Sequence, residues 1–489
     1  MEQNPIVWII VASYMIFVFV KGILKVREIE STDDFLVAGR SVSWFFLFCT
    51  MGATVIGGGA SIGAIAKTYD WGIMMVLVST GWYIHFIFSG LVVAPQFREA
   101  KLYTVAGFFG YRFGEGPRFV ILILSLLFSV FIVAAQMAAF GSVLSAILPQ
   151  FSDATTVLRT AIIVGGLMVV IYSTAGGLKA VIQTDVYQFI ILFVGFIITV
   201  LFCLPDIIHN TSNEIQHLPQ TFFSPHGGKG WLTLITTFLA FLLGETFAPG
   251  YATRYCVGKN IRETRKGIAG VGIFLAVTFP VILFIIALYA RLHFPDINPQ
   301  QALPKVIQQL NNAVVAGLIV GALLMAVMSS ADSALNSSTA IFIKDLFEHQ
   351  LNWNDTPQRP LLPIARICSF ALGVIAILIA LFRSDIINLL LFTYHIWAPA
   401  VILPVITGAI LKGRSIEYSR HILVTMIVAT VAAMSYKILL MLHSAEDDVL
   451  PGSWYTLMEK IDTSVFGVTV SVLTFCVTLV TIGKRAKTS

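Results

Sequence analysis

Charged residues are scarce in this chain of 489 residues: 12% are Asp, Glu, Lys or Arg, whereas 57% are hydrophobic, and the mean hydropathy is +0.86. The surface of a soluble domain needs roughly twice that share of charge. Apolar runs of about 20 residues recur along the chain, and such a run lets a helix cross a hydrocarbon core of about 30 Å. The composition therefore places the chain in a lipid bilayer.

Cysteine motifs, signal-peptide features and long loops are also scarce in this sequence. The five cysteines show neither a C-x-x-C pair nor a metal-ligand spacing, so we interpret them as packing residues. The first apolar run lacks a basic segment and a cleavage-site pattern, which indicates a retained helix and not a signal peptide. No loop is long enough for an appended enzymatic or output domain, and no nucleophile–base pair or cofactor motif is present, so we expect neither an enzyme nor a bound cofactor. The net charge of +5 comes from basic residues at helix ends, which indicates membrane topology and not a nucleic-acid partner.

A hydropathy window of about 19 residues predicts thirteen transmembrane helices. They are 6–25, 43–66, 72–95, 119–148, 157–175, 184–205, 231–253, 266–290, 313–343, 364–382, 386–411, 420–442 and 463–483. Lys and Arg, with Arg254 among them, concentrate in alternate connections, which predicts an N-terminus outside the cell and a cytoplasmic C-terminus. We expect a single multi-pass domain in a cell membrane, either a bacterial inner membrane or a plasma membrane.

Two of these spans contain helix-breaking residues. Gly57, Gly58 and Gly59 lie in the second span, and each costs about 1 kcal/mol relative to Ala in a helix. The seventh span is interrupted by Gly244, Pro249 and Gly250. Paired breaks are typical of transporters with inverted repeats, here residues 43–205 and 231–411, with an extra helix at 6–25 and C-terminal helices at 412–489. Alternatively, the glycines of the first break only permit close helix packing.

Polar oxygens and carboxylates lie within other spans. Ala326, Ser329, Ser330 and Ser333 follow helical spacing and share one face, which suits a hard cation such as sodium. The alternative is that the serines bond back to their own helix. Asp332 flanks this face, and Asp185 begins the sixth span, where it is either functional or an N-cap.

Five segments together resemble the sodium:solute symporter family, and most closely its high-affinity choline transporter branch. They are VAGR at 37–40, GGG at 57–59, GGLKAVIQTD at 176–185, TR at 253–254 and SSADS at 329–333. The resemblance covers nearly the whole chain and implies an all-α LeuT-type fold that works by alternating access. By position, it implies a main sodium site at the oxygens of Ala53, Ile56, Ala326, Ser329 and Ser330. It implies a second sodium site at Asp185, Asp332 and Ser333, where Asp332 replaces a serine of those members.

The resemblance also outlines a solute cavity. Its expected lining is Val55, Trp82, Tyr83, Gln136, Glu245, Tyr394, His395 and Trp397. Three positions that are tryptophan in the choline branch are Val55, Ile132 and Ala248 here, which argues against choline. Trp82, Tyr83 and His395 are equally compatible with packing roles. Glu245, in the second break, needs a cationic solute, a bound cation or a proton.

These observations predict a sodium-coupled symporter that imports a small organic solute, with sodium as the coupling ion. The alternative is a proton-coupled or sodium-independent carrier on the same fold, with Asp185, Asp332 or Glu245 as its proton site. A membrane sensor or ion channel derived from a transporter is a third reading.

Overall fold

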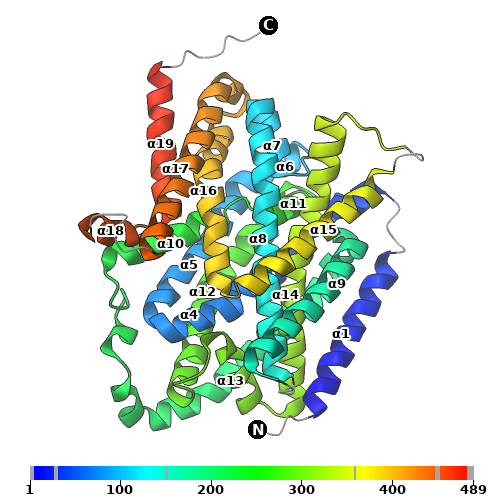
Figure 1. Cartoon of the computed structure of the whole chain (residues 1–489). Helices are drawn as coiled ribbons and strands as arrows, with labels where there is room; N and C mark the ends of the chain where they lie inside the picture. The colour runs from blue at the N-terminus through cyan, green and yellow to red at the C-terminus, as the bar shows by residue number, and fades with distance from the viewer. Residues whose placement is uncertain (1–4, 27–30, 149–151, 357–359, 446–451, 482–489) are drawn as a thin grey trace.

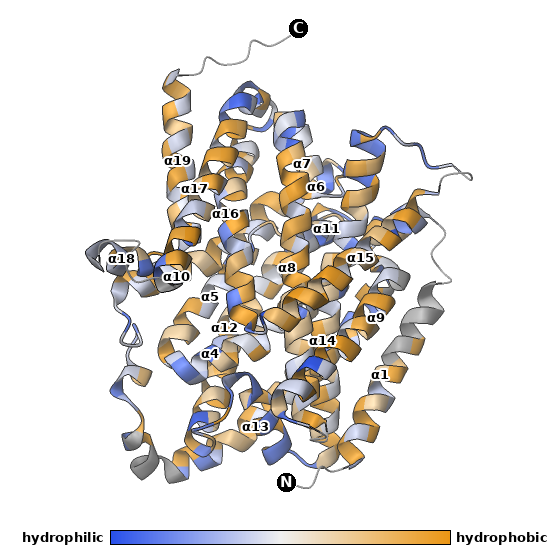
Figure 2. Cartoon of the chain, viewed as in Figure 1, coloured by the Kyte–Doolittle hydropathy of each residue, from blue (hydrophilic) through white to orange (hydrophobic). Residues whose placement is uncertain are grey.

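The computed structural model describes residues 5–26, 31–148, 152–356, 360–445 and 452–481, which are almost entirely helical and contain no β-strand. The helices pack as one bundle, with α1 (Pro5–Val26) beginning and α19 (Thr463–Thr481) ending at opposite ends of it (Figure 1). Hydrophobic residues dominate the lengths of the long helices, and hydrophilic residues gather at their ends and in the connections (Figure 2). The chain is thus a multi-pass membrane protein, as its hydropathy predicts.

Each expected span corresponds to a helix or a bent helix pair. Within the described residues, nine helices are long and apolar enough to cross a membrane, or eleven when two bent pairs are counted. One of the nine, Ile386–His443, contains two expected spans, and α1 contributes a shorter apolar helix, Pro5–Phe17. The remaining continuous elements are α5 (Ile73–Phe88), α6 (Ala94–Glu99), α8 (Glu115–Ile147), α12 (Ile261–His293), α14 (Ala313–Ala340), α15 (Leu361–Phe382), α16 (Ile386–Leu411) and α17 (Ser419–Ala445).

The fifth and sixth expected spans lie in one element, α9 (Ala154–Glu214), as its two apolar parts Ala154–Thr174 and Gly177–His209, which follow each other directly. The helical path is interrupted there only at Gly177, whose φ is +67°. A Cβ at this position would lie 2.5 Å from the ring of Phe35 in α2 (Thr32–Val37). Glycine therefore provides both the backbone conformation and the space for the kink.

Two spans are bent at their glycines. The first is α3 (Trp44–Val55) followed by a π-helical turn (Gly59–Gly63) and α4 (Ala64–Trp71), with a bend of 56°. The second is α10 (Trp231–Gly244) followed by α11 (Pro249–Tyr255), with a bend of 50°. Each bend frees backbone groups inside the bundle, which a membrane protein tolerates where they line a cavity.

The buried helix α14 connects these bent pairs to the rest of the bundle. It packs against α9, α8 and α1, and it also contacts α3 and α11. Nearly all of its residues are buried, including every residue from Ile319 to Ala340. Shorter helices, α7 (Val105–Phe113), α13 (Ala302–Leu310) and α18 (Gly452–Glu459), lie in the connections between spans.

Candidate functional site

A cavity lies where the two bends approach α14. Its wall includes Gly57 and Gly59 of the first bend, Glu245 and Gly250 of the second, and Ser330 of α14. Trp82 of α5, Gln136 of α8 and Leu390 of α16 complete the sides. Gln136 also accepts a hydrogen bond from the backbone N–H of Gly58 at 2.9 Å, which holds α8 against the first bend.

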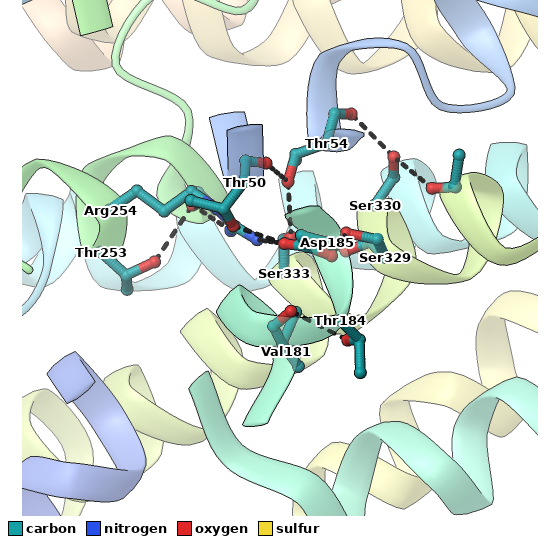
Figure 3. Close-up of polar contacts among 12 residues, drawn as sticks. Thr50, Thr54, Val181, Thr184, Asp185, Thr253, Arg254, Ser329, Ser330 and Ser333 are labelled. Atoms are coloured by element: carbon teal, nitrogen blue, oxygen red, sulfur yellow. Dashed lines mark hydrogen bonds and ion pairs between the residues drawn. The ribbon is translucent and has the colours of Figure 1, made fainter. Parts of the chain in front are cut away.

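The serines of α14 contact the first bend directly (Figure 3). The Ser330 hydroxyl donates to the Thr54 carbonyl at 2.7 Å and lies 3.2 Å from the Ala326 carbonyl. The Ser333 hydroxyl donates to the Ser329 carbonyl at 2.6 Å and lies 3.3 Å from the Thr54 hydroxyl. Ala53 and Ile56 flank Thr54 at the buried end of α3. Hydroxyl and carbonyl oxygens from two helices therefore gather at this point.

Asp185 of α9 lies beside these serines in a buried ion pair with Arg254 (Figure 3). The Arg254 Nη2 is 3.3 Å from Asp185 Oδ2, and both side chains are fully buried. Asp185 also accepts hydrogen bonds from the hydroxyls of Ser329, at 2.6 Å, and Thr50. The expectation that Arg254 lies in a cytoplasmic loop is wrong, because α11 resumes after the second bend and carries Arg254 into the bundle.

The two carboxylates of the expected second sodium site, Asp185 and Asp332, have different partners. Asp332 contacts the hydroxyl of Ser173, in the part of α9 that precedes the Gly177 kink, whereas Asp185 follows that kink. Arg254 makes its ion pair with Asp185 and gives its remaining hydrogen bonds to Thr50 and the Gly250 carbonyl. Within the expected second site, Arg254 therefore forms an ion pair with Asp185 and not with Asp332.

Glu245 connects the second bend to α16. The Tyr251 hydroxyl donates to one of its carboxylate oxygens at 2.7 Å, and the Tyr394 hydroxyl donates to the other at 2.8 Å. Tyr394 in turn accepts a hydrogen bond from the Trp82 indole N–H at 2.8 Å. Of the expected solute-cavity residues, Val55, Trp82, Gln136 and Glu245 line the cavity, and Tyr394 contacts the lining residue Glu245.

Tyr83, His395 and Trp397 do not line this cavity. Tyr83 packs against Phe279 of α12, with ring centroids 6.0 Å apart. Trp397 donates its indole N–H to the Thr246 carbonyl at 3.0 Å. His395 borders a separate cavity beside α17 and α19, with its Nε2 3.6 Å from an oxygen of Asp462. Successive residues of a helix point about 100° apart, so His395, next to Tyr394 on α16, faces other helices.

Asp462 lies in the connection between α18 and α19. Burial acts to raise the pKa of this carboxyl, but His395 and the hydrogen bonds from Ser464 outweigh it and hold the pKa below its ordinary value. Asp462 is thus an anionic partner for His395. This contact gives His395 a role in packing α16 against α19.

The known proteins that resemble this chain are transporters. The model of the sodium:solute symporter family matches residues 35–418. The high-affinity choline transporter 1 of Caenorhabditis elegans is 27% identical over 387 residues, which are 74% of this chain and 65% of that protein. The chain thus aligns with just under two thirds of that transporter's length. The sodium/sialic acid symporter NanT of Aliivibrio fischeri is 27% identical over 394 residues, which are 76% of this chain and 75% of that protein.

The fold matches a solved structure over its whole length. The substrate-bound, outward-open structure of a Na⁺-coupled sialic acid symporter superimposes with a TM-score of 0.76 at 20% identity, covering 100% of both chains. The expected LeuT-type, all-α fold is therefore confirmed. These relatives are transporters and not enzymes, as the sequence predicts.

Proposed function

Because this chain belongs to the sodium:solute symporter family, we propose that it is a sodium-coupled symporter that imports a small organic solute by alternating access. The observation that carries the proposal is the position of Ser330. Its hydroxyl lines the cavity and also bonds to the first bend, so the oxygens suited to sodium adjoin the space suited to a solute. Occupancy of one site then affects the geometry of the other, as coupled transport requires.

The main sodium ion in this proposal binds the carbonyl oxygens of Ala53, Ile56 and Ala326 and the hydroxyl oxygens of Ser329 and Ser330. Such oxygens suit a hard monovalent cation. The Ser329 hydroxyl donates its proton to Asp185, so its lone pairs remain available for the ion. Asp185 acts in this arrangement without adding net charge, because Arg254 balances it.

A second sodium site at Asp185, Asp332 and Ser333 is part of the proposal. Since Arg254 pairs with Asp185, the charge left to balance a second cation is that of Asp332. Intramembrane carboxylates commonly mark ion sites for this reason.

We further propose that the solute is cationic, since Glu245 lies in the cavity wall. The protein is proposed to act as a single transmembrane domain with inverted repeats at 43–205 and 231–411. We place it in the cell membrane with the N-terminus outside and the C-terminus in the cytoplasm, on the distribution of its Lys and Arg residues.

Replacing Ser330 with Ala is expected to raise the sodium concentration for half-maximal uptake by roughly tenfold, because a ligand worth about 1.4 kcal/mol is lost. Uptake of a panel of labelled solutes into proteoliposomes, with and without a sodium gradient, checks this. Ser338→Ala is the matched control, since Ser338 donates to the Ala334 carbonyl on the same helix and does not line the cavity. Uptake that needs no sodium would favour the proton-coupled or sodium-independent alternative.

Replacing Asp332 with Asn is expected to lower the charge moved per solute, because the second cation loses its anionic ligand. Parallel measurement of current and solute uptake in proteoliposomes gives this ratio. A ratio equal to that of the wild type would leave Asp332 without a role in binding a transported cation.

A further inference from the structure

The carboxylate of Glu245 has no cationic side chain beside it in the cavity. None of the described residues that line the cavity is Lys, Arg or His. The nearby guanidinium of Arg254 is used by Asp185, Thr50 and the Gly250 carbonyl. The two groups that contact Glu245 are the phenol hydroxyls of Tyr251 and Tyr394, which donate hydrogen bonds but carry no compensating charge. A carboxylate in such a wall favours a positively charged guest.

The hydroxyl groups of the cavity wall are set up as acceptors, whereas the Gln136 amide, whose oxygen accepts from the Gly58 N–H, adds N–H donors. Four lining hydroxyls already donate their protons to backbone carbonyls of α3, α8 and α14. These are Thr54 to Thr50 at 2.8 Å, Ser129 to Ser125 at 2.9 Å, Ser330 to Thr54 at 2.7 Å and Ser333 to Ser329 at 2.6 Å. Each hydroxyl has one proton, so its remaining capacity is that of an acceptor. A guest rich in hydrogen-bond donors complements this wall.

The carboxylate itself has room for further donors. An ionised carboxylate offers about four lone-pair sites. One site on each oxygen of Glu245 is taken by a tyrosine hydroxyl. An N–H group of the guest can fill a remaining site with a charge-assisted hydrogen bond, whereas a nitrogen without hydrogen cannot.

Aliphatic side chains occupy much of the remaining wall. Val55, Ile132, Ala248 and Leu390 line the cavity and provide no π-face. A quaternary ammonium has no N–H and depends on an aromatic cage. The aromatic residues in the cavity wall are Trp82, Phe128 and Tyr251. The wall therefore suits a short aliphatic body attached to a nitrogen that donates hydrogen bonds.

We infer that the solute of this cavity is a small organic cation whose charged nitrogen carries hydrogen, a primary or secondary ammonium and not a quaternary one. This inference rests on the proposed function, because it assigns the solute class of the same cavity. Glu245 binds the nitrogen, and the hydroxyl oxygens accept its further hydrogens or those of a neighbouring donor group.

A series of ligands that differ only in the number of N–H groups tests the inference. Aminoethanol and its mono-, di- and trimethylated forms share one skeleton, and their binding to the purified protein in sodium can be measured by thermal stabilisation. Apparent affinity is expected to fall along the series, by roughly tenfold or more from the primary to the trimethylated form, since charge-assisted hydrogen bonds are lost. In Glu245→Gln, the primary amine is expected to bind roughly tenfold more weakly and the spread of the series to shrink. Glu459→Gln, the same change at an exposed position on α18 outside this cavity, should leave the series unaltered.

Three results would overturn the inference. They are equal or tighter binding of the trimethylated form, an unaltered series in Glu245→Gln, and stabilisation by neutral or anionic solutes but by no amine. The wild-type series decides the outcome alone if Glu245→Gln fails to fold. Binding that follows the N–H series but is indifferent to sodium would contradict the proposed symport and leave the solute class standing. Sodium-dependent uptake together with tighter binding of the more methylated amines would support the proposed symport and contradict the inferred solute class.

Discussion

Replacing Asp185 with Asn is expected to destabilise the protein by about 3–5 kcal/mol, because it leaves a buried guanidinium without its ion-pair partner. Arg254 and Asp185 are both fully buried, with 3.3 Å between nitrogen and oxygen. The groups that would still contact Arg254, the Thr50 hydroxyl and the Gly250 carbonyl, carry no negative charge. Unfolding of the purified protein by heat and by denaturant measures the loss.

A surface ion pair of the same length supplies the control. Lys67 and Asp385 are also 3.3 Å apart, but the Asp385 side chain is 41% exposed. Asp385→Asn is expected to cost no more than about 1 kcal/mol, as exposed pairs do, and Asn retains the capping of α16 that Asp385 provides. The double variant Asp185→Asn with Arg254→Gln should recover most of the loss, since it buries no unpaired charge. Equal stability losses in Asp185→Asn and Asp385→Asn would contradict this account of the buried pair.

The same pair connects stability to ion binding. Asp185 accepts the hydroxyl proton of Ser329, a proposed sodium ligand, while Arg254 connects Asp185 to the helix that follows the second bend. The amide oxygen of Asn accepts the Ser329 hydroxyl proton more weakly than the carboxylate does, so the hydroxyl is held less firmly in the proposed sodium site. Sodium affinity should fall in Asp185→Asn even where the folded protein is recovered.

The sequence was sufficient to predict the spans and both bends. Bilayer thickness sets the length of an apolar helix, so hydropathy marks the spans, and Gly57 to Gly59 and Gly244 to Gly250 mark the bends because glycine and proline weaken helices locally. Both signals are local along the chain. The kink at Gly177 was harder to predict, because a single left-handed residue interrupts α9 without ending it.

The ion pair between distant residues and the rotation of each helix about its axis could not be predicted in the same way. Basic residues usually lie at membrane surfaces, so the sequence predicts a loop position for Arg254. Its partner Asp185 is 69 residues away in sequence. The motif TR at 253–254 was visible, but only the fold brings it to α9. Tyr394, His395 and Trp397 are close in sequence, yet their partners differ. Tyr394 contacts Glu245 and Trp397 contacts Thr246, both in the second bend, whereas His395 lies beside Asp462, because the rotation of α16 decides what each side chain meets.

Replacing Gly57 with Ala is expected to raise the sodium concentration for half-maximal uptake by at least about tenfold, a loss of about 1.4 kcal/mol or more in ion binding. A Cβ at this position would lie 2.0 Å from the Ser330 hydroxyl oxygen and 2.9 Å from its Cβ. Such contacts are too short to persist, so the serine must rotate away from the Thr54 carbonyl to which it donates. The change thus moves the Ser330 hydroxyl out of the proposed ion site, although none of the proposed ligand residues is itself substituted.

Gly59→Ala is the matched control within the same glycine triplet. A Cβ there would meet only the tip of the Leu390 side chain, at 2.4 Å from Cδ1, and that tip can move to another rotamer. Both substitutions lower backbone freedom equally, so a general need for glycine flexibility would affect both variants alike. We expect a large rise in the half-saturating sodium concentration for Gly57→Ala and less than about a threefold rise for Gly59→Ala. That result would mean that Gly57 is needed because it leaves space for the Ser330 side chain. Equal effects would mean that the triplet serves the bend and not the ion site.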